Sequence, residues 1–309
     1  MKRDHGGDLD AAIAKYGGVK SDWIDLSTGI NPTPYPIPEI IPASWNSLPD
    51  HRATTSLENA ARKFWDVPDS AAVLAAPGAS SLIARIPGLV TTGAVSIPGP
   101  TYNEHAAAFS AQGWSLAADN YQAKVLVHPN NPDGRYWPGL VPDQKLTIID
   151  ESFCDVTPAR SLINLSTTPG TLILKSFGKF WGLAGLRLGF AIGDPALVER
   201  LAELLGPWPV SGPALAIGAK ALRDETWTVS TRQQLAKDAS RLDDIMTAQD
   251  AKLVGGTPLF RLYHVDSAAR WQDRFAQACI WTRTFPYSDN WLRLGLPPAN
   301  AWHRISEAS

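Results

Sequence analysis

Short apolar runs alternate with helical patterns through the first two thirds of this chain. The runs cover residues 71–75, 94–97, 124–128, 146–149, 171–174 and 188–192, with helical patterns at 80–86 and 102–112. This order is typical of a mainly parallel sheet with helices on its faces. Ligands bind beyond the carboxyl ends of such strands, so the polar residues that follow each run are candidates for a site.

The composition narrows the class of protein. Hydrophobic residues make up 44% and charged residues 19%, which indicates a globular chain rather than a disordered one. The net charge of −2 argues against a nucleic-acid or membrane-surface partner. Two cysteines offer no disulfide framework and no thiolate cluster, so we expect no metal site. The first residues lack a secretory signal and no apolar run approaches ~20 residues, so we expect a cytoplasmic protein.

The length of 309 residues predicts about two domains, at roughly 150 residues each. Repeated prolines between residues 29 and 49 indicate an extended arm, and a Gly- and Pro-rich break at 206–213 interrupts the helical pattern. We therefore expect an arm over residues 1–45 that packs with the small domain, a large domain over 46–207, and a smaller α+β domain over 208–309.

The stretch from 174 to 190 is the richest in reactive groups. A strand ends at Ser176, Lys179 follows among aromatic residues, and a glycine-rich turn leads to Arg187. A partly desolvated lysine has a lowered pKa and can act as a neutral amine nucleophile. A hydroxyl and a guanidinium can together hold a phosphate. The alternative is that Lys179 is an ordinary surface lysine and that the glycines only form turns.

Two more polar residues follow predicted strands. Asp150 comes directly after the run 146–149, where a carboxylate can bind and protonate a heterocyclic nitrogen; it can equally cap a helix or turn. Asn131 lies in the stretch 128–135, where its amide can donate to a phenolate oxygen. The Asn-Pro and Asp-Gly pairs of that stretch are also typical of a plain turn.

A turn and an aromatic residue complete the set. Gly78, Ala79 and Ser80 open a predicted helix, where backbone amides can bind phosphate; Ser80 can also simply cap that helix. Tyr102 follows the run 94–97 and can lie flat on a planar ring, although a core position is the common role of such a tyrosine.

The joint order of these residues resembles the pyridoxal-phosphate enzymes of fold type I, the aspartate-aminotransferase-like group. Residues 178–189 (GKFWGLAGLRLG) are similar to the group's lysine segment, and residues 131–134 (NPDG) to its Asn-Pro-x-Gly turn. The resemblance spans most of the chain. It implies an α/β fold of type I, pyridoxal 5'-phosphate as the cofactor, and a homodimer.

The resemblance also implies roles for single residues. Lys179 forms the Schiff base with the cofactor, Asp150 keeps the ring nitrogen protonated, and Asn131 donates to the phenolic oxygen. Tyr102 stacks on the ring. The remaining cofactor residues hold the phosphate: Gly78, Ala79, Ser80, Ser176 and Arg187.

Within that group the chain is similar to the threonine-phosphate decarboxylases of cobalamin biosynthesis. The similar segments are 5–8 (HGGD), 25–32 (DLSTGINP), 150–153 (DESF), 282–287 (TRTFPY) and 291–297 (WLRLGLP). The resemblance implies decarboxylation of O-phospho-L-threonine, a small phosphorylated amino acid, to (R)-1-aminopropan-2-yl phosphate. It assigns substrate binding to His5, Asn31, Arg283 and Arg293.

Two positions depart from the pattern. Gly178 stands where the group usually has a hydroxyl residue before the lysine, and Leu48 stands where many relatives have a tyrosine that reaches the phosphate across a dimer interface. A histidinol-phosphate-type aminotransferase is the first alternative reading. The two departures keep open a second alternative, a cofactor-binding protein without turnover that acts in a biosynthetic complex.

Overall fold

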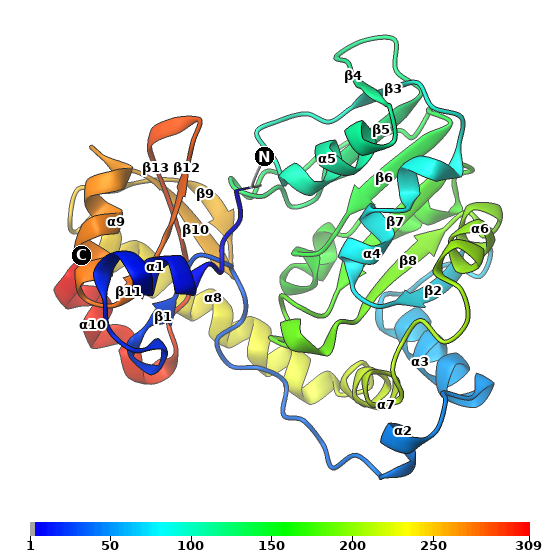
Figure 1. Ribbon diagram of the computed structural model, residues 1–309, viewed down its shortest axis with the longest axis horizontal. Helices are drawn as coiled ribbons and strands as arrows, with labels where there is room; N and C mark the ends of the chain where they lie inside the picture. The colour runs from blue at the N-terminus through cyan, green and yellow to red at the C-terminus, as the bar shows by residue number, and fades with distance from the viewer. Residues whose placement is uncertain (1–3) are drawn as a thin grey trace. The chain divides into compact units, whose positions relative to one another are not determined.

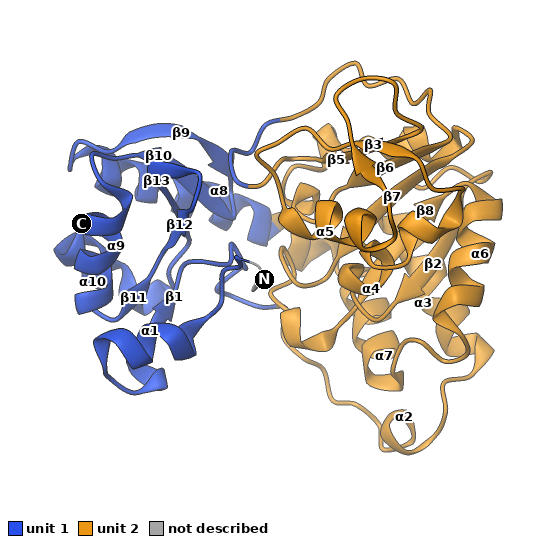
Figure 2. Ribbon diagram, turned by 45° about the horizontal axis from the view of Figure 1, so that its top comes forward, with its two compact units in different colours: residues 1–34, 132–135, 230–309 blue, residues 35–131, 136–229 orange. Residues whose placement is uncertain are grey.

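The computed structural model describes residues 4–309, which divide into two compact units (Figure 2). Unit 1 contains the residues up to Pro34, Pro132–Arg135 and Ser230–Ser309. Unit 2 contains Tyr35–Asn131 and Tyr136–Val229. Unit 2 thus includes residues 208–229, which the sequence placed in the small domain, and the domain bounds 1–45, 46–207 and 208–309 stay a prediction.

Unit 2 is built on a mixed sheet of seven strands among its described residues (Figure 1). Their spatial order is β2-β8-β7-β6-β5-β3-β4, and β8 runs antiparallel to β2 and β7 while the other pairs are parallel. The mainly parallel α/β sheet predicted from the sequence is confirmed. The strands are β2 (Ala72–Ala76), β3 (Ala94–Ser96), β4 (Ser115–Leu116), β5 (Ala123–Val127), β6 (Leu146–Asp150), β7 (Thr171–Ser176) and β8 (Gly189–Gly193).

The centre of this sheet is buried on both faces. Every residue of β6 and β8 is buried, and so are the first five residues of β7. Strands that are buried along their whole length, such as Leu146–Asp150, are expected where helices cover both sides of parallel strands. The flanking helices are α2 (Ala43–Asn46), α3 (His51–Phe64), α4 (Ala79–Ile83), α5 (Asn103–Ala111), α6 (Pro195–Leu205) and α7 (Gly212–Ala221).

Side-chain caps decide where several of these helices begin. Asp50 accepts a hydrogen bond from the backbone N–H of Ala53, so α3 starts at His51. Asp194 caps α6 by accepting from the backbone N–H of Ala196, with Pro195 at the first helical position, where its missing N–H costs nothing.

The register of the central strands brings their carboxyl ends to one edge. Val127 of β5 pairs with Asp150 of β6, and Asp150 pairs with Leu174 of β7. The residues just after these positions therefore emerge side by side, as expected for parallel strands.

Unit 1 holds a second, antiparallel sheet and a short parallel pair. The sheet order is β12-β13-β10-β9, and β1 pairs with β11. Helix α8 (Glu225–Thr247) begins in unit 2 and ends in unit 1. The other elements are α1 (Leu9–Tyr16), β1 (Ile24–Asp25), β9 (Lys252–Thr257), β10 (Phe260–His264), α9 (Ala268–Gln277), β11 (Ile280–Trp281), β12 (Arg283–Phe285), β13 (Ser288–Gly295) and α10 (Trp302–Ala308).

Within residues 4–309, no helix has both the length and the apolar content needed to cross a bilayer.

A close backbone approach joins β8 to the start of α4. A Cβ added at Gly189 would lie 2.5 Å from the amide nitrogen of Ala79 and 2.8 Å from the carbonyl carbon of Gly78. Neither neighbour is the end of a flexible side chain, so a side chain here must push the α4 turn away from β8.

We predict that Gly189→Ala lowers the free energy of unfolding by about 2 kcal/mol or more, because overpacking forces the backbone to shift. Chemical denaturation measures the change. Gly185→Ala is the matched control, because a Cβ at Gly185 meets nothing within 4 Å. If the two variants have equal free energies of unfolding, the α4 turn moves away from β8 at little cost, and the prediction is wrong.

Candidate active site

One pocket of unit 2 lies at the carboxyl ends of β5, β6 and β7. Eight of the nine predicted cofactor residues line it: Ala79, Ser80, Tyr102, Asn131, Asp150, Ser176, Lys179 and Arg187. The ninth, Gly78, is the N-cap residue of α4 and directly precedes Ala79. The structure thus gathers residues that are distant in the sequence, because the parallel strands end, and the antiparallel β8 begins, at the same edge of the sheet.

Asp150 supplies a buried carboxylate at the end of β6. Its side chain is 2% exposed, and its Oδ1 accepts from the backbone N–H and the hydroxyl of Ser152 at 3.0 and 2.6 Å. Its Oδ2 lies 2.8 Å from Nε2 of His105. Burial alone would raise the pKa of Asp150, but His105 and the two bonds from Ser152 hold it below its usual value.

His105 is a residue that the sequence reasoning missed. It is 2% exposed in α5, and its imidazole packs edge-on to Tyr102 with ring centroids 6.1 Å apart. The sequence around His105 carries no pattern that places its imidazole against Asp150, because that contact depends on how α5 packs on the sheet.

Arg187 and Ser80 form one polar wall of the pocket. Nη2 of Arg187 donates to Oγ of Ser80 at 2.9 Å, and its Nη1 donates to the carbonyl of Ala184 at 3.0 Å. Arg187 has a φ of 53°, which aims its side chain back over the turn. Gly78 has a φ of 83°, and a Cβ there would lie 2.5 Å from Nη2 of Arg187, so only glycine leaves room for the guanidinium.

Ser176 and Gly178 lie between that wall and the lysine. Oγ of Ser176 accepts from the backbone N–H of Gly178 at 3.2 Å, so the hydroxyl also shapes the turn. A Cβ at Gly178 would meet Ala184 at 3.4 Å and Oγ of Ser176 at 3.5 Å, which are ordinary contacts. Space therefore does not explain the glycine. Leu48, the second departure, is 67% exposed.

Lys179 enters the pocket from the turn that follows β7. Its ammonium nitrogen lies 5.0 Å from the centre of the Phe153 ring, and Phe153 also lines the pocket. The backbone N–H of Gly182 donates to the carbonyl of Lys179 at 3.1 Å and closes the turn. The amine and the Asp150 carboxylate thus belong to the same cavity.

The donor set fits the cofactor that the resemblance implies. A planar ring with a basic nitrogen needs an ionised carboxylate, which the pocket offers at Asp150. A phosphate needs hydroxyl and guanidinium donors, which Ser80, Ser176 and Arg187 offer. An aldehyde needs a nucleophilic amine, which Lys179 offers. The close approach of the Gly78 backbone to the guanidinium of Arg187 is consistent with this fit.

The predicted substrate residues lie in unit 1, and two of them are neighbours. Arg283 on β12 pairs in register with Arg293 on β13. Arg293 is 4% exposed, and its Nη2 donates to the carbonyl of Ser27. Burial, and next the charge of Arg283, lowers the pKa of Arg293 to about 10. An anion bound between these guanidiniums would relieve their repulsion.

Arg283 already has an acidic partner. Its Nη1 and Nη2 donate to the two carboxylate oxygens of Asp4 at 2.6 and 2.7 Å. His5, which follows Asp4, is exposed. Asn31 is 3% exposed, and its Oδ1 accepts from the backbone N–H of Thr33 at 2.9 Å. No sequence pattern predicted that an aspartate occupies the fork of Arg283.

His128, Glu151 and Cys154 place metal-ligand atoms within 4.8 Å of one another. Both imidazole nitrogens of His128 have protein partners: Nε2 lies 2.7 Å from the carbonyl of Arg160, and Nδ1 accepts from the backbone N–H of Trp137. Burial raises the pKa of the Cys154 thiol. A protonated thiol and an occupied imidazole are poor ligands, so this cluster gives no argument for a metal.

The fold and the pocket define a member of a known enzyme class. Residues 115–302 match the family model described as aminotransferase class I and II. The chain belongs to this family, as the resemblance predicted.

Two curated relatives are similar along almost the whole chain. A threonine-phosphate decarboxylase of Sinorhizobium sp is 37% identical over 97% of this chain and 95% of its own length. A threonine-phosphate decarboxylase of Pseudomonas aeruginosa is 35% identical over 99% and 96%. Among solved structures, histidinol-phosphate aminotransferase from Sinorhizobium meliloti, in complex with pyridoxal-5'-phosphate, superposes with a TM-score of 0.82 at 17% identity, over 97% of this chain and 92% of that one. That likeness confirms the fold.

The Asp150 carboxylate should depend on His105 for its charge. Because the folded-state pKa of Asp150 is lowered, its ionisation stabilises the fold above the unfolded-state pKa and ceases to do so as the pH falls through the folded-state value. We predict that His105→Leu raises the pKa of Asp150 and lowers the free energy of unfolding at pH 7 by about 1–3 kcal/mol.

Denaturant titrations across pH measure this effect. The gap in unfolding free energy between wild type and His105→Leu should narrow as the pH falls below the raised pKa of Asp150 in the variant, because ionised Asp150 then no longer distinguishes the two folded proteins. His303→Leu, the same change at an exposed position, should leave stability within about 0.5 kcal/mol of wild type. A gap of constant size at every pH would contradict an electrostatic role for His105.

Proposed function

We propose that this protein is a pyridoxal-phosphate-dependent decarboxylase that converts O-phospho-L-threonine to (R)-1-aminopropan-2-yl phosphate in cobalamin biosynthesis. The observation that carries the proposal is the similarity, at 37% and 35% identity over nearly the entire chain, to two threonine-phosphate decarboxylases. The pocket chemistry supports it, since the residues that such an enzyme needs line one cavity.

Bound pyridoxal 5'-phosphate supplies an aldehyde for the substrate amine and a ring that accepts the electron pair of a breaking bond at Cα. Asp150 holds a proton on the ring nitrogen, because its carboxylate stays ionised. Asn131 donates to the phenolic oxygen, and Tyr102 stacks on the ring. The phosphate is held by Ser80, Ser176, Arg187 and the backbone amides near Gly78 and Ala79.

Lys179 has two duties in this scheme. Its Nζ is the amine that would hold the cofactor through its aldehyde. Once carbon dioxide has left, the same nitrogen delivers a proton to Cα as a general acid. Both duties need Nζ close to the substrate carbon, so the turn that carries Lys179 must keep its position.

The choice between decarboxylation and transamination depends on where the protein holds the substrate's acidic groups. The bond that breaks is the one perpendicular to the ring, so the group held in that direction leaves. We assign the anion clamps to Arg283, Arg293 and His5, with Asn31 near the carboxylate. Asp4 occupies Arg283 in the structure, so a substrate anion that binds Arg283 must displace the Asp4 carboxylate.

Two further properties belong to this proposal. The family resemblance supports a homodimer as the working form, and the composition supports a cytoplasmic location. Sedimentation or light scattering of the purified protein measures the first.

Product analysis tests the reaction itself. We predict that the protein with cofactor releases carbon dioxide from O-phospho-L-threonine without any 2-oxo acid, and that Lys179→Ala releases none and loses the visible absorbance band of the bound cofactor. Lys237→Ala, an exposed lysine on α8, is the matched control. A strict need for a 2-oxo acid, with glutamate consumed or formed, would instead favour a histidinol-phosphate-type aminotransferase.

Arg293 tests the substrate clamp separately. We predict that Arg293→Gln raises KM for O-phospho-L-threonine by about 10- to 100-fold, the equivalent of one lost charge-assisted hydrogen bond, while the cofactor band stays. Arg261→Gln, in the neighbouring strand β10, removes a guanidinium bound to Asp243 instead. It should affect stability but not KM, and an equal rise of KM in both variants would argue against a clamp at Arg293.

A further inference from the structure

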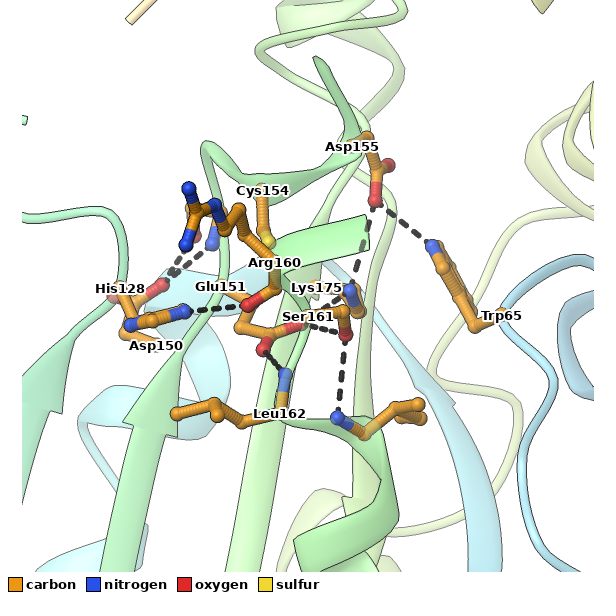
Figure 3. A network of polar contacts seen from close by, with 12 residues as sticks. Trp65, His128, Asp150, Glu151, Cys154, Asp155, Arg160, Ser161, Leu162 and Lys175 are labelled. Carbon is orange, nitrogen blue, oxygen red and sulfur yellow. Dashed lines mark hydrogen bonds and ion pairs between the residues drawn. The ribbon is translucent and has the colours of Figure 1, made fainter. Parts of the chain in front are cut away.

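Three charged side chains form a buried cluster at the ends of β6 and β7 (Figure 3). Lys175 is 1% exposed, Glu151 0% and Asp155 4%. Each of the first two is adjacent in sequence to a pocket residue: Glu151 follows Asp150, and Lys175 precedes Ser176. Successive side chains of a strand point to opposite faces, so this cluster and the pocket occupy opposite faces of the same strand ends.

The charges of the cluster are matched by close partners. Nζ of Lys175 lies 2.5 Å from Oε2 of Glu151 and 3.7 Å from Oδ1 of Asp155. Glu151 also accepts from the hydroxyl of Ser161 and the backbone N–H of Leu162. Burial alone would lower the pKa of Lys175, but the two carboxylates raise it above its usual value. A buried charge without such partners would be very costly.

Asp155 connects this cluster to two tryptophans. Its Oδ1 accepts from the indole N–H of Trp65 at 2.8 Å, and its Oδ2 accepts from the indole N–H of Trp181 at 3.2 Å. Trp65 is the C-cap residue of α3. Trp181 belongs to the turn of Lys179, two residues further along the chain, and is fully buried. The Asp155 carboxylate therefore contacts both the end of α3 and the turn that carries Lys179.

The ring of Trp181 is also held by stacking. It lies parallel to Phe177 and Trp227, with centroids 4.9 and 5.3 Å apart and planes within 10° and 12°. Stacking fixes the plane of an aromatic ring but permits it to slide, whereas a hydrogen bond at its edge fixes the direction of the N–H. The Asp155 contact supplies that second restraint.

We propose that Asp155, held by Lys175, is a positioning residue for Lys179: through the indole N–H of Trp181 it fixes the turn that aims the lysine into the pocket. Asp155 itself does not line the pocket, so it acts only through Trp181. The proposal rests on the proposed function for what Lys179 does there. The role of Asp155 concerns only the geometry of this chain, so it can be tested whether or not the proposed substrate is correct.

Small displacements of a reacting group are costly. A misplacement of about 1 Å can reduce a rate by about 100-fold, because the reacting atoms must meet within a narrow range of distance and angle. Loss of one hydrogen bond leaves the stacking of Trp181 in place, so we expect a partial displacement. The rate constant kcat should therefore fall by about tenfold, with KM nearly unchanged because no substrate-binding group is touched.

The two tryptophans provide a matched pair of variants. Trp181→Phe and Trp65→Phe each remove one indole N–H from the same carboxylate and keep an aromatic ring. Both should lower thermal stability, but only Trp181→Phe releases the turn of Lys179. The proposal therefore predicts a tenfold lower kcat for Trp181→Phe and a kcat within about twofold of wild type for Trp65→Phe.

Two readouts do not depend on turnover. One is the pH titration of the visible cofactor band, which should shift in Trp181→Phe and not in Trp65→Phe. The other is hydrogen–deuterium exchange in the cofactor-free protein, where residues 177–183 should exchange faster in Trp181→Phe only. If wild type fails to decarboxylate O-phospho-L-threonine, the proposed function is wrong, and these two readouts still decide the role of Asp155.

Asp155→Asn is the second variant, needed if Trp181→Phe does not fold. An amide offers one acceptor oxygen instead of two, and Lys175 and the shorter Trp65 bond both lie on the Oδ1 side. The amide nitrogen then faces Trp181, so this variant should reproduce the band shift with both indoles present. Equal effects of the Trp65 and Trp181 variants on kcat, band titration and exchange would overturn the proposal.

Discussion

The whole arrangement depends on keeping one carboxylate ionised inside the protein. Asp150 is 2% exposed, and burial by itself would favour its neutral form. Three contacts reverse that preference, one from His105 and two from Ser152. A neutral Asp150 could still accept a hydrogen bond, but it could not hold a positive charge on a ring nitrogen. The placement of α5, which carries His105, is therefore as important to the site as the strand that carries Asp150.

The sequence was sufficient to predict the pocket because of a property of parallel sheets. Ser176, Asp150 and Asn131 each follow a short apolar run, and the fold brings all such positions to one edge. Local sequence therefore predicted that these residues lie close together in the fold. The antiparallel direction of β8 was harder to predict from the sequence. A buried strand is a continuous apolar run whether it is parallel or antiparallel to its neighbours.

The sequence could not predict contacts between two residues that no sequence pattern connects. Nothing near His105 shows that it faces Asp150, 45 positions away. Nothing near Asp4 shows that it fills the fork of Arg283, 279 positions away. Side-chain pairs of this kind depend on the packing of complete elements, which a pattern of apolar residues does not specify. The same is true of the bond between Asp155 and Trp181, although both residues lie close to predicted site residues.

The ends of β6 and β7 place polar side chains on both faces of the sheet. Asp150 and Ser176 line the pocket, while Glu151 and Lys175, their neighbours in sequence, make an ion pair on the other side. A shift of β6 relative to β7 would therefore separate Lys175 from Glu151 in the low-dielectric interior, where the lost attraction is large. The ion pair thus resists the movements that would change the distance between the carboxylate and the lysine turn. The polar pocket keeps its geometry because the charges behind it cannot move apart without losing their partners.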